Sequence, residues 1–263
     1  SLSFGGLIVK SFEGANLWQI LFWRSLFFSI TILVFLLITY KKKIFNSFYI
    51  SGLPGFIAGT ILSLGFCGYV IAMYSTTVAN TNFIISLQIL FLAVFGYFFL
   101  KEKIPSITLF SIILAMVGVL IMVGNSLSPG ELVGNLAAFS MPVTFAVLII
   151  IVRKYPTIDM VPAQFVAGIC CCLIGYFISN KIMISYHDIF LGFLAGFFQI
   201  GFGFIFITIG ARTTPSAMVG VIMLSESVLG PLWAFLFVSE RPSIFSLIGG
   251  AIILFAVLIQ FYN

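Results

Sequence analysis

The sequence predicts an all-α integral membrane protein whose ten transmembrane helices form two inverted five-helix repeats. Three observations lead to this fold class. The chain of 263 residues is 62% hydrophobic and 7% charged, which leaves too little charge to cover the surface of a water-soluble domain. Apolar segments of about 20 residues, the length that spans a bilayer, recur along the whole chain. Two of these segments carry similar polar residues at both ends, which indicates an internal duplication.

Polar residues, prolines and glycines divide the chain into ten segments. The first, 1–10, is typical of the second half of a membrane helix, so we expect the chain to lack the start of helix 1. Because lipid offers no partners to backbone N–H and C=O groups, each segment must be helical. The links are short, so neighbouring helices must run antiparallel. The other nine helices are expected at 17–40, 54–75, 77–100, 105–124, 132–152, 160–179, 189–211, 214–238 and 243–262.

Lysine and arginine predict the orientation of these helices. Alternate loops hold most of the cations, namely Lys41 to Lys43, Lys101 with Lys103, Arg153 with Lys154, and Arg212. The positive-inside rule therefore places both termini in the cytoplasm. We expect a bacterial inner-membrane protein surrounded by the lipid bilayer. The cations are not gathered into one basic domain, so no nucleic-acid partner is expected.

The duplication relates residues 76–106, TTVANTNFIISLQILFLAVFGYFFLKEKIPS, to residues 213–243, TTPSAMVGVIMLSESVLGPLWAFLFVSERPS. A shift of 138 residues aligns Gln88 with Glu226 and Glu102 with Glu240. The Thr pairs and the Pro-Ser endings prefer a shift of 137, so the register stays open by one residue.

A unit of five helices reverses its direction on each copy, because five is odd. The two predicted repeats, residues 1–126 and 127–263, are therefore inverted about a pseudo-twofold axis in the membrane plane. Secondary transporters use this arrangement and bind substrate near the midplane between the repeats.

With these features the chain resembles the drug/metabolite transporters, and among them the ten-helix EamA-type members. The resemblance rests on the twin endings FFLKEKIPS and FLFVSERPS, on FWRSLFF, on the Gly-rich third and eighth helices, and on IILAMVGVLIMV. It implies a secondary carrier of small organic metabolites with both termini cytoplasmic and a central cavity. Substrates of the family include amino acids, nucleotide sugars, amines and drugs, so the resemblance does not name the cargo.

Glu226 is the main candidate site residue, because it lies near the middle of the predicted helix 214–238. A charge at that depth costs about 2.5–3.5 kcal/mol on insertion scales, so it must face a partner or a wet cavity. Trp233 follows one heptad later on nearly the same face. A carboxylate and an aromatic ring so placed suit an organic ammonium, through charge and cation–π attraction.

Two other roles for Glu226 remain open. Burial disfavours the charged form of a carboxylate, so Glu226 is also a candidate proton carrier that couples transport to a proton gradient. Alternatively, it forms a structural salt bridge with Arg24, the one arginine within a predicted span. Arg24 is also a candidate contact for a substrate carboxylate.

Further polar residues complete the candidate substrate site. Gln88 is the counterpart of Glu226 in the first repeat, and Gln199 lies in the eighth helix. Ser140 and Thr144 flank Pro142, which interrupts the sixth helix near its middle.

Three residues predict helix breaks or hinges. Pro142 and Pro231 each leave a backbone carbonyl without its N–H donor. Gly230 allows the backbone of another helix to approach closely. The acids Glu102 and Glu240 are expected to close helix ends or to pair with Lys101, Lys103 and Arg241.

The sequence favours transport over other functions. It holds no HExxH, Walker-A or GxSxG motif and a single histidine, so neither an enzyme nor a metal or cofactor is expected. The predicted function is transport of amino acids or related amines and zwitterions by alternating access, coupled to protons or to exchange. The alternatives are a carrier of organic cations seated on Glu226 and aromatic residues, and a non-transporting structural membrane protein. A monomer and a homodimer both suit the predicted fold.

Overall fold

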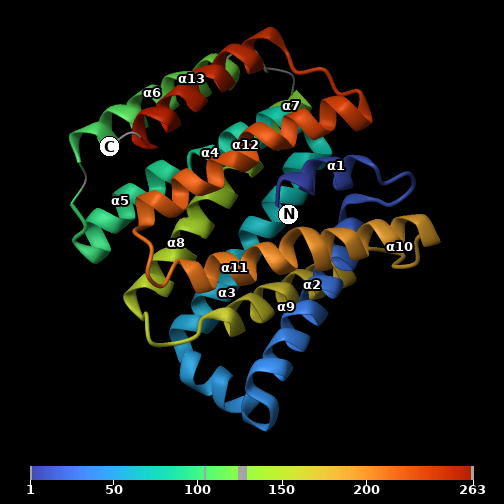
Figure 1. The fold of residues 1–263 in the computed structure, drawn as a ribbon. Coiled ribbons are helices and arrows are strands. Elements are labelled where there is room, and N and C mark those ends of the chain that lie inside the picture. Colours follow the sequence, from blue (N-terminus) through green and yellow to red (C-terminus); the bar gives the residue numbers. More distant parts are fainter. Residues whose placement is uncertain (1, 104, 124–128, 262–263) are drawn as a thin grey trace.

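The structure is a computed structural model that describes residues 2–103, 105–123 and 129–261. Within these ranges the chain is helical and contains no β-strand, so the predicted all-α class is confirmed. Figure 1 shows the elements, which are η1 Leu2–Phe4, α1 Gly5–Lys10, α2 Leu17–Tyr40, η2 Lys41–Lys43, α3 Ile44–Ser75, α4 Val78–Ser86, α5 Gln88–Leu100, α6 Ser106–Val123, α7 Pro129–Ala138, α8 Ser140–Lys154, α9 Val161–Ile178, α10 Tyr186–Phe193, η3 Leu194–Phe202, α11 Gly203–Gly210, α12 Ser216–Val238 and α13 Ile244–Phe261.

Each of the ten expected segments corresponds to one helix or to consecutive helical pieces. The stretches Leu17–Ser75, Val78–Leu100, Glu131–Lys154, Val161–Ile178 and Tyr186–Gly210 are long and apolar enough to cross a membrane. The first of them contains two helices, α2 and α3, joined by the turn η2. Shorter apolar stretches at Leu109–Gly118, Leu229–Val238 and Leu247–Ala256 belong to α6, α12 and α13. The chain is therefore an integral membrane protein.

The third helix starts earlier than expected. It was predicted from residue 54, but α3 begins at Ile44 and bends at Gly52, where φ is 51° and ψ is −150°. Glycine adopts this backbone conformation without the steric cost that a side chain would bring. Pro54 follows two residues later and disfavours an unbroken helix through this point. Gly52 thus turns a short helical piece, Ile44–Ser51, away from the span that follows.

Three of the spans are irregular near their middle. The fourth is divided at Leu87, and the sixth is divided at Phe139, three residues before Pro142. The eighth contains the π-helix η3 between α10 and α11. By contrast, α12 continues as a helix through Pro231. The break near Pro142 agrees with its predicted position, whereas hinge motion at Pro231 stays a prediction.

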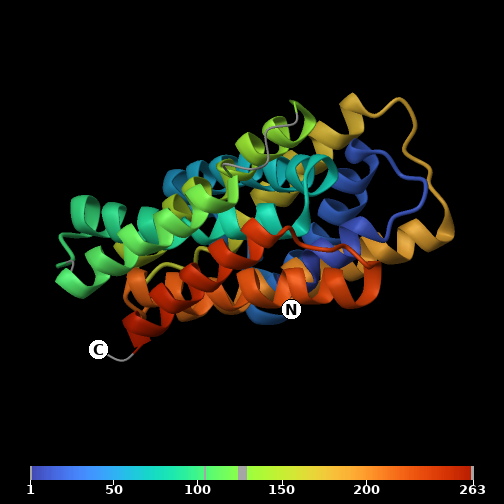
Figure 2. The same cartoon turned by 90° about the horizontal axis from the view of Figure 1, so that it is seen from above.

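Contacts between helices show the internal symmetry: when each helix is replaced by its equivalent in the other half of the chain, a contact is found again. Three contacts join a helix to its own counterpart: α6 with α13, α2 with α9, and α4 and α5 with α12. Several other contacts have an equivalent in the exchanged halves; for example, α3 packs on α9 as η3 packs on α2. Figures 1 and 2 show α6 and α13 side by side at one edge of the bundle. This exchange is the pseudo-twofold relation that the sequence predicts. The predicted boundary between residues 126 and 127 lies outside the described residues.

The ends of α5 and α12 fix the register of the two repeats. Lys101 and Ser239 both adopt the left-handed conformation, with φ of 55° and 56°. The following residues, Glu102 and Glu240, donate their backbone N–H groups to the carbonyls of Gly96 and Ala234, at 3.1 and 3.3 Å. All three pairs differ by 138 residues. The structure therefore selects the shift of 138, which makes Gln88 and Glu226 equivalent positions.

Glycines allow α3 to pack closely against the second half of the chain. A Cβ atom added to Gly59 would lie 2.3 Å from the backbone oxygen of Ala163 in α9 and 2.7 Å from the Cβ of Val166. Neither atom belongs to a flexible side-chain end, so the two helices would have to separate. By contrast, a Cβ atom added to Gly210 has no neighbour within 4 Å.

We predict that Gly59→Ala destabilises the folded protein, whereas Gly210→Ala leaves its stability equal or slightly raised. Overpacking of this kind costs about 1–3 kcal/mol, and alanine in an exposed helix gains about 0.5–1 kcal/mol over glycine. Thermal unfolding of both purified variants in detergent measures the effect. Equal melting temperatures for the two variants would contradict the close approach of α3 and α9.

Candidate functional site

Five polar side chains from five different elements converge on one cavity in the middle of the bundle. They are Arg24 of α2, Tyr69 of α3, Gln88 of α5, Gln199 of η3 and Glu226 of α12. The rest of the wall is apolar and consists of Leu2, Ile85, Met141, Phe145, Ile200, Phe204 and Met223. The cavity has a volume of about 10 Å³, which is room for about one water molecule. Both repeats contribute to it, as expected for a site on the pseudo-twofold axis.

Arg24 is the largest charged group in this interior. Its side chain is 2% exposed, and its guanidinium lies over the rings of Tyr69 and Phe66, 4.7 and 5.7 Å from their centroids. Its Nε has no hydrogen-bond partner among the described residues. A buried guanidinium normally has an anionic or carbonyl partner, because burial removes its hydration. The cation–π contacts therefore offset only part of the hydration free energy that the Arg24 guanidinium loses on burial.

Glu226 lines the same cavity as Arg24 and is half-buried. Among the residues that the structure describes, ion pairs join Arg153 to Glu102, His187 to Asp188 and Arg212 to Asp159, and none joins Arg24 to Glu226. The structural salt bridge considered from the sequence is thus absent in this conformation. Arg24 and Glu226 thus line one cavity without forming an ion pair.

Three further polar atoms in the cavity wall lack hydrogen-bond partners in the described part of the chain. They are the Tyr69 hydroxyl oxygen, Gln88 Nε2 and Gln199 Oε1, and all three are buried. A buried polar atom without a partner costs about 1–3 kcal/mol. Several such atoms lie together where a ligand or an ordered water molecule supplies the missing hydrogen bonds. The other amide atom of Gln199, Nε2, donates to the carbonyl of Leu2 at 3.2 Å, which holds that side chain in place.

Irregular backbone carries both glutamines into the cavity. Gln88 is the first residue of α5, directly after the break at Leu87, where the Leu87 N–H bonds to the carbonyl of Ile84 at 3.1 Å. Gln199 lies within the π-helix η3. Such π-helical turns occur often at functional sites, because they redirect side chains.

The structure therefore brings together four of the predicted site residues, Arg24, Gln88, Gln199 and Glu226. It adds Tyr69, which the sequence interpretation missed. A tyrosine in an apolar helix is a common packing residue, and nothing in its spacing marks it. The available signal is that Tyr69 lies in the glycine-rich third span, where a phenol among small residues faces other helices.

Trp233 lies outside the wall of the central cavity. It was expected beside Glu226, but its indole stacks on Phe4 with ring centroids 5.2 Å apart and an interplanar angle of 10°. Its Nε1 donates to the hydroxyl of Ser3 at 3.2 Å. The side chain thus packs α12 against the N-terminal segment, and it does not line the central cavity. Contact of Trp233 with a cation stays a prediction, which the ring's packing on Phe4 does not support.

Ser140 and Thr144 also lie outside the cavity wall. Ser140 Oγ donates to the carbonyl of Ala137, and Thr144 Oγ1 donates to the carbonyl of Ser140, at 2.7 and 2.9 Å. Both hydroxyls press against glycines of α3, since a Cβ atom at Gly68 or Gly65 would lie 1.8 or 2.0 Å from them. These two residues join α8 to α3, so their predicted contact with substrate is not found.

Gly230 has a close neighbour, which is a side chain of α4 rather than the expected backbone. A Cβ atom at Gly230 would lie 1.9 Å from Asn82 Nδ2. Ser227 Oγ on the same helix donates to the carbonyl of Asn82 at 2.9 Å. Gly230 and Ser227 therefore fix α12 against α4, next to the cavity.

Equivalent acids connect the repeats at the two ends of the bundle. Glu102 accepts hydrogen bonds from Arg153 Nε at 2.7 Å and from the hydroxyl of Ser216, the first residue of α12, at 3.4 Å. Glu240 accepts the backbone N–H of Val78, the first residue of α4, at 2.7 Å.

Ser216 and Val78 are themselves 138 residues apart. Glu240 thus caps the N-terminus of α4, and Glu102 contacts the first side chain of α12, both at helix starts where the helix dipole favours an anion. The expectation that these acids close helix ends is confirmed, but Glu102 pairs with Arg153 rather than with a neighbouring lysine.

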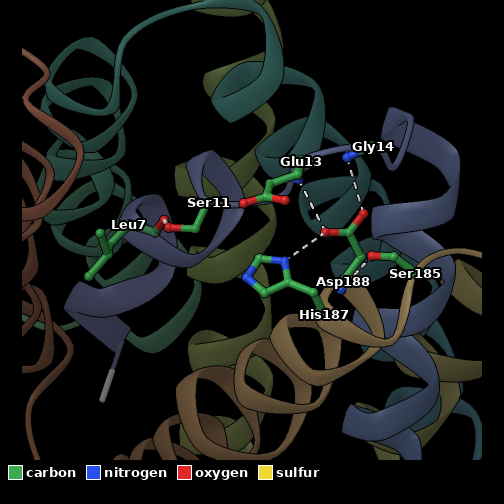
Figure 3. A network of polar contacts seen from close by, with 7 residues as sticks. All are labelled: Leu7, Ser11, Glu13, Gly14, Ser185, His187 and Asp188. Carbon is green, nitrogen blue, oxygen red and sulfur yellow. Dashed lines mark hydrogen bonds and ion pairs between the residues drawn. The ribbon is translucent and has the colours of Figure 1, made fainter.

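Two aspartates hold loops at the same two ends. Figure 3 shows the Asp188 carboxylate accepting the backbone N–H groups of Glu13 and Gly14, at 3.1 and 3.2 Å. At the other end, Asp159 accepts the hydroxyl of Tyr40 at 2.7 Å and pairs with Arg212. Both ends of the bundle are thus tied by charged contacts. Among the described residues, no group of three or more His, Cys, Asp or Glu side chains is placed to hold a metal ion.

Comparisons with known proteins agree with this architecture. The model of the EamA-like transporter family matches residues 1–124 and again residues 128–262. An uncharacterized transporter of Methanothermobacter thermautotrophicus is 25% identical over 202 residues, which are 72% of this chain and 58% of that protein. The chain thus spans little more than half the length of that relative.

A solved crystal structure superimposes with a TM-score of 0.74 over 98% of this chain and 92% of the other, at 14% identity. That likeness shows a shared fold. The family match covers nearly the whole sequence, and its ten-helix membrane fold is the one described above. This chain belongs to the EamA-like transporter family.

Proposed function

We propose that this protein is a secondary-active transporter of small zwitterions, namely amino acids or related amines, that works by alternating access. The observation that carries the proposal is the pair of opposite charges, Arg24 and Glu226, that line one cavity without forming an ion pair. A zwitterion supplies both missing counter-charges at once. Its carboxylate suits the guanidinium of Arg24, and its ammonium suits the carboxylate of Glu226.

The unpartnered polar atoms support the same class of substrate. Gln88 Nε2 is a donor for a carboxylate, and Gln199 Oε1 is an acceptor for an ammonium. A site built to hydrogen-bond its substrate discriminates strongly against analogues that lack those groups, because its own buried groups are then left unpaired. The apolar remainder of the wall suits the side chain of the substrate.

The alternative substrate class, an organic cation without an anionic group, receives less support. Such a cation would share the cavity with the guanidinium of Arg24, which repels it. Arg24 also occupies the face of Tyr69, and Trp233 stacks on Phe4 instead of facing the cavity. A non-transporting structural role leaves the unpartnered polar atoms of the cavity without an explanation.

The cycle we propose begins from the conformation described here. The central cavity holds about one water molecule, and charged contacts tie both ends, so this conformation is occluded. Opening one end at a time exposes the site alternately to the two sides. We assign the end that holds Arg153 and Arg212 to the cytoplasmic side of a bacterial inner membrane, with both termini on that side.

Glu226 takes up a proton when the substrate ammonium leaves, which couples transport to protons or to exchange. A single chain supplies the whole site, so both a monomer and a homodimer are compatible with this transport cycle.

We predict that Glu226→Gln lowers the uptake of zwitterionic substrates by about 10- to 100-fold. One charge-assisted hydrogen bond is worth about 1.5–3 kcal/mol, and each 1.4 kcal/mol is tenfold. Proteoliposomes with an imposed pH gradient and a panel of amino acids, choline-like amines and neutral drugs measure net uptake and counterflow exchange. Glu13→Gln, at an exposed acid outside the cavity, is the matched control.

The outcomes separate the roles of Glu226. Loss of gradient-driven uptake with exchange retained identifies a proton carrier, and loss of both identifies the ammonium seat. Reduced thermal stability, restored when Arg24→Gln is combined with Glu226→Gln, indicates a structural pair. Uptake equal to that of wild type would place the site elsewhere.

The two capping acids give a prediction about the gates. We expect Glu102→Gln to open the end that carries Arg153, because it removes an ion pair and a contact with the start of α12. Spin labels at Lys103 and Thr157, which are exposed at this end, should then show a longer distance by double electron–electron resonance. Glu240→Gln acts at the opposite end and should leave this distance unchanged. The same distance in both variants and wild type would contradict a gate at Glu102.

A further inference from the structure

A second and larger cavity lies between α12 and α13. Its volume is about 600 Å³, within the range of sites for small organic ligands. Its walls include Phe83 of α4, Leu232 and Phe235 of α12, Arg241, and Leu247 and Ala251 of α13. None of these residues lines the central cavity. The two cavities therefore use different faces of α12.

The larger cavity opens toward the lipid. Leu232, Phe235 and Leu247 line it and are 44%, 49% and 55% exposed. Exposed apolar side chains within transmembrane helices face the acyl chains of the bilayer. Moreover, α13 packs chiefly on α6, and this pair forms an edge of the bundle beside α12 (Figure 1). An acyl chain can thus enter from the side without passing through either end of the transporter.

One charged residue lines this apolar cavity. Arg241 follows the C-terminus of α12, which ends at Val238, and its side chain is exposed. The ion pairs of the described residues do not include Arg241. Arginine at the end of a membrane helix is well placed for a phosphate, which accepts two parallel hydrogen bonds from a guanidinium.

We propose that a membrane phospholipid occupies this cavity, with an acyl chain between α12 and α13 and its phosphate at Arg241. The apolar walls match the chain, the lateral opening gives it access, and the cation matches the headgroup. The bound lipid fills the space that α12, α13 and Phe83 leave open between them. It thereby supports the helix that carries Glu226 from its other face. The proposal concerns lipid binding, so it stands or falls independently of the transported substrate.

Native mass spectrometry of the purified protein, titrated with dioleoylphosphatidylglycerol in detergent, tests the site. Ala251→Trp fills the cavity and should abolish the tightest binding event, while Leu258→Trp, on an exposed position of α13 outside the cavity, should retain it. Arg241→Gln should weaken binding about tenfold through loss of charge-assisted hydrogen bonds. Lys181→Gln, an exposed cation that does not line the cavity, should leave binding as in wild type.

Three results would overturn the proposal. The first is equal binding by Ala251→Trp and Leu258→Trp. The second is an equal effect of Arg241→Gln and Lys181→Gln. The third is binding of dioleoylglycerol, which lacks the phosphate, as tight as that of the phospholipid, since the occupant would then be any apolar molecule. Thermal unfolding identifies a variant that fails to fold, and if Ala251→Trp does so, Ala251→Leu and Arg241→Gln decide the question.

Discussion

The structure depends on how two opposite charges are kept in the interior of a membrane protein. Arg24 and Glu226 line one small cavity, and each carries the cost of leaving water. In a soluble protein, water would reach such groups, or the two would pair. Here Arg24 rests on aromatic faces, and no ion pair joins it to Glu226. Under the proposed function, a zwitterionic substrate supplies the counter-charge that each of the two side chains lacks.

The internal symmetry explains how this arrangement can reach both sides of the membrane. Gln88 and Glu226 occupy equivalent positions, so the duplication has placed an amide where the other repeat has a carboxylate. The acids Glu102 and Glu240 are likewise equivalent, and each contacts the helix start of the opposite repeat. The contacts between the repeats are stronger at one end than at the other, however, because Glu102 also forms an ion pair with Arg153. Similar contacts at opposite ends, unequal in energy, suit a protein that opens one end at a time.

Much of this architecture could be predicted from the sequence. Hydropathy and the polar residues at helix ends gave the ten segments and the all-α class, because a membrane permits few other arrangements of backbone hydrogen bonds. Four site residues, Arg24, Gln88, Gln199 and Glu226, stood out since a polar group at membrane depth needs a partner. The break before Pro142 also followed from a local rule, the missing N–H of proline.

Other features depended on tertiary contacts that no local pattern reports. Trp233 lies one heptad beyond Glu226, but its indole finds Phe4 and Ser3 in a distant segment. Ser140 and Thr144 pack against glycines of α3, which a sequence cannot align with them. Tyr69 was missed because a phenol in an apolar helix carries no distinctive spacing. The break at Leu87 has no proline or glycine at its centre, so neither of these local signals could predict it.

The most direct test of a shared central site is its accessibility from both sides of the membrane. A single cysteine at position 85, in the apolar wall of the central cavity, is introduced by Ile85→Cys after the four native cysteines have been replaced. It is treated in oriented proteoliposomes with a membrane-impermeant thiol reagent added from either side. Alternating access predicts labelling from both sides, slowed in each case by a transported zwitterion. Labelling from one side alone, or from both sides without protection by substrate, would contradict a central site that the two repeats expose in turn.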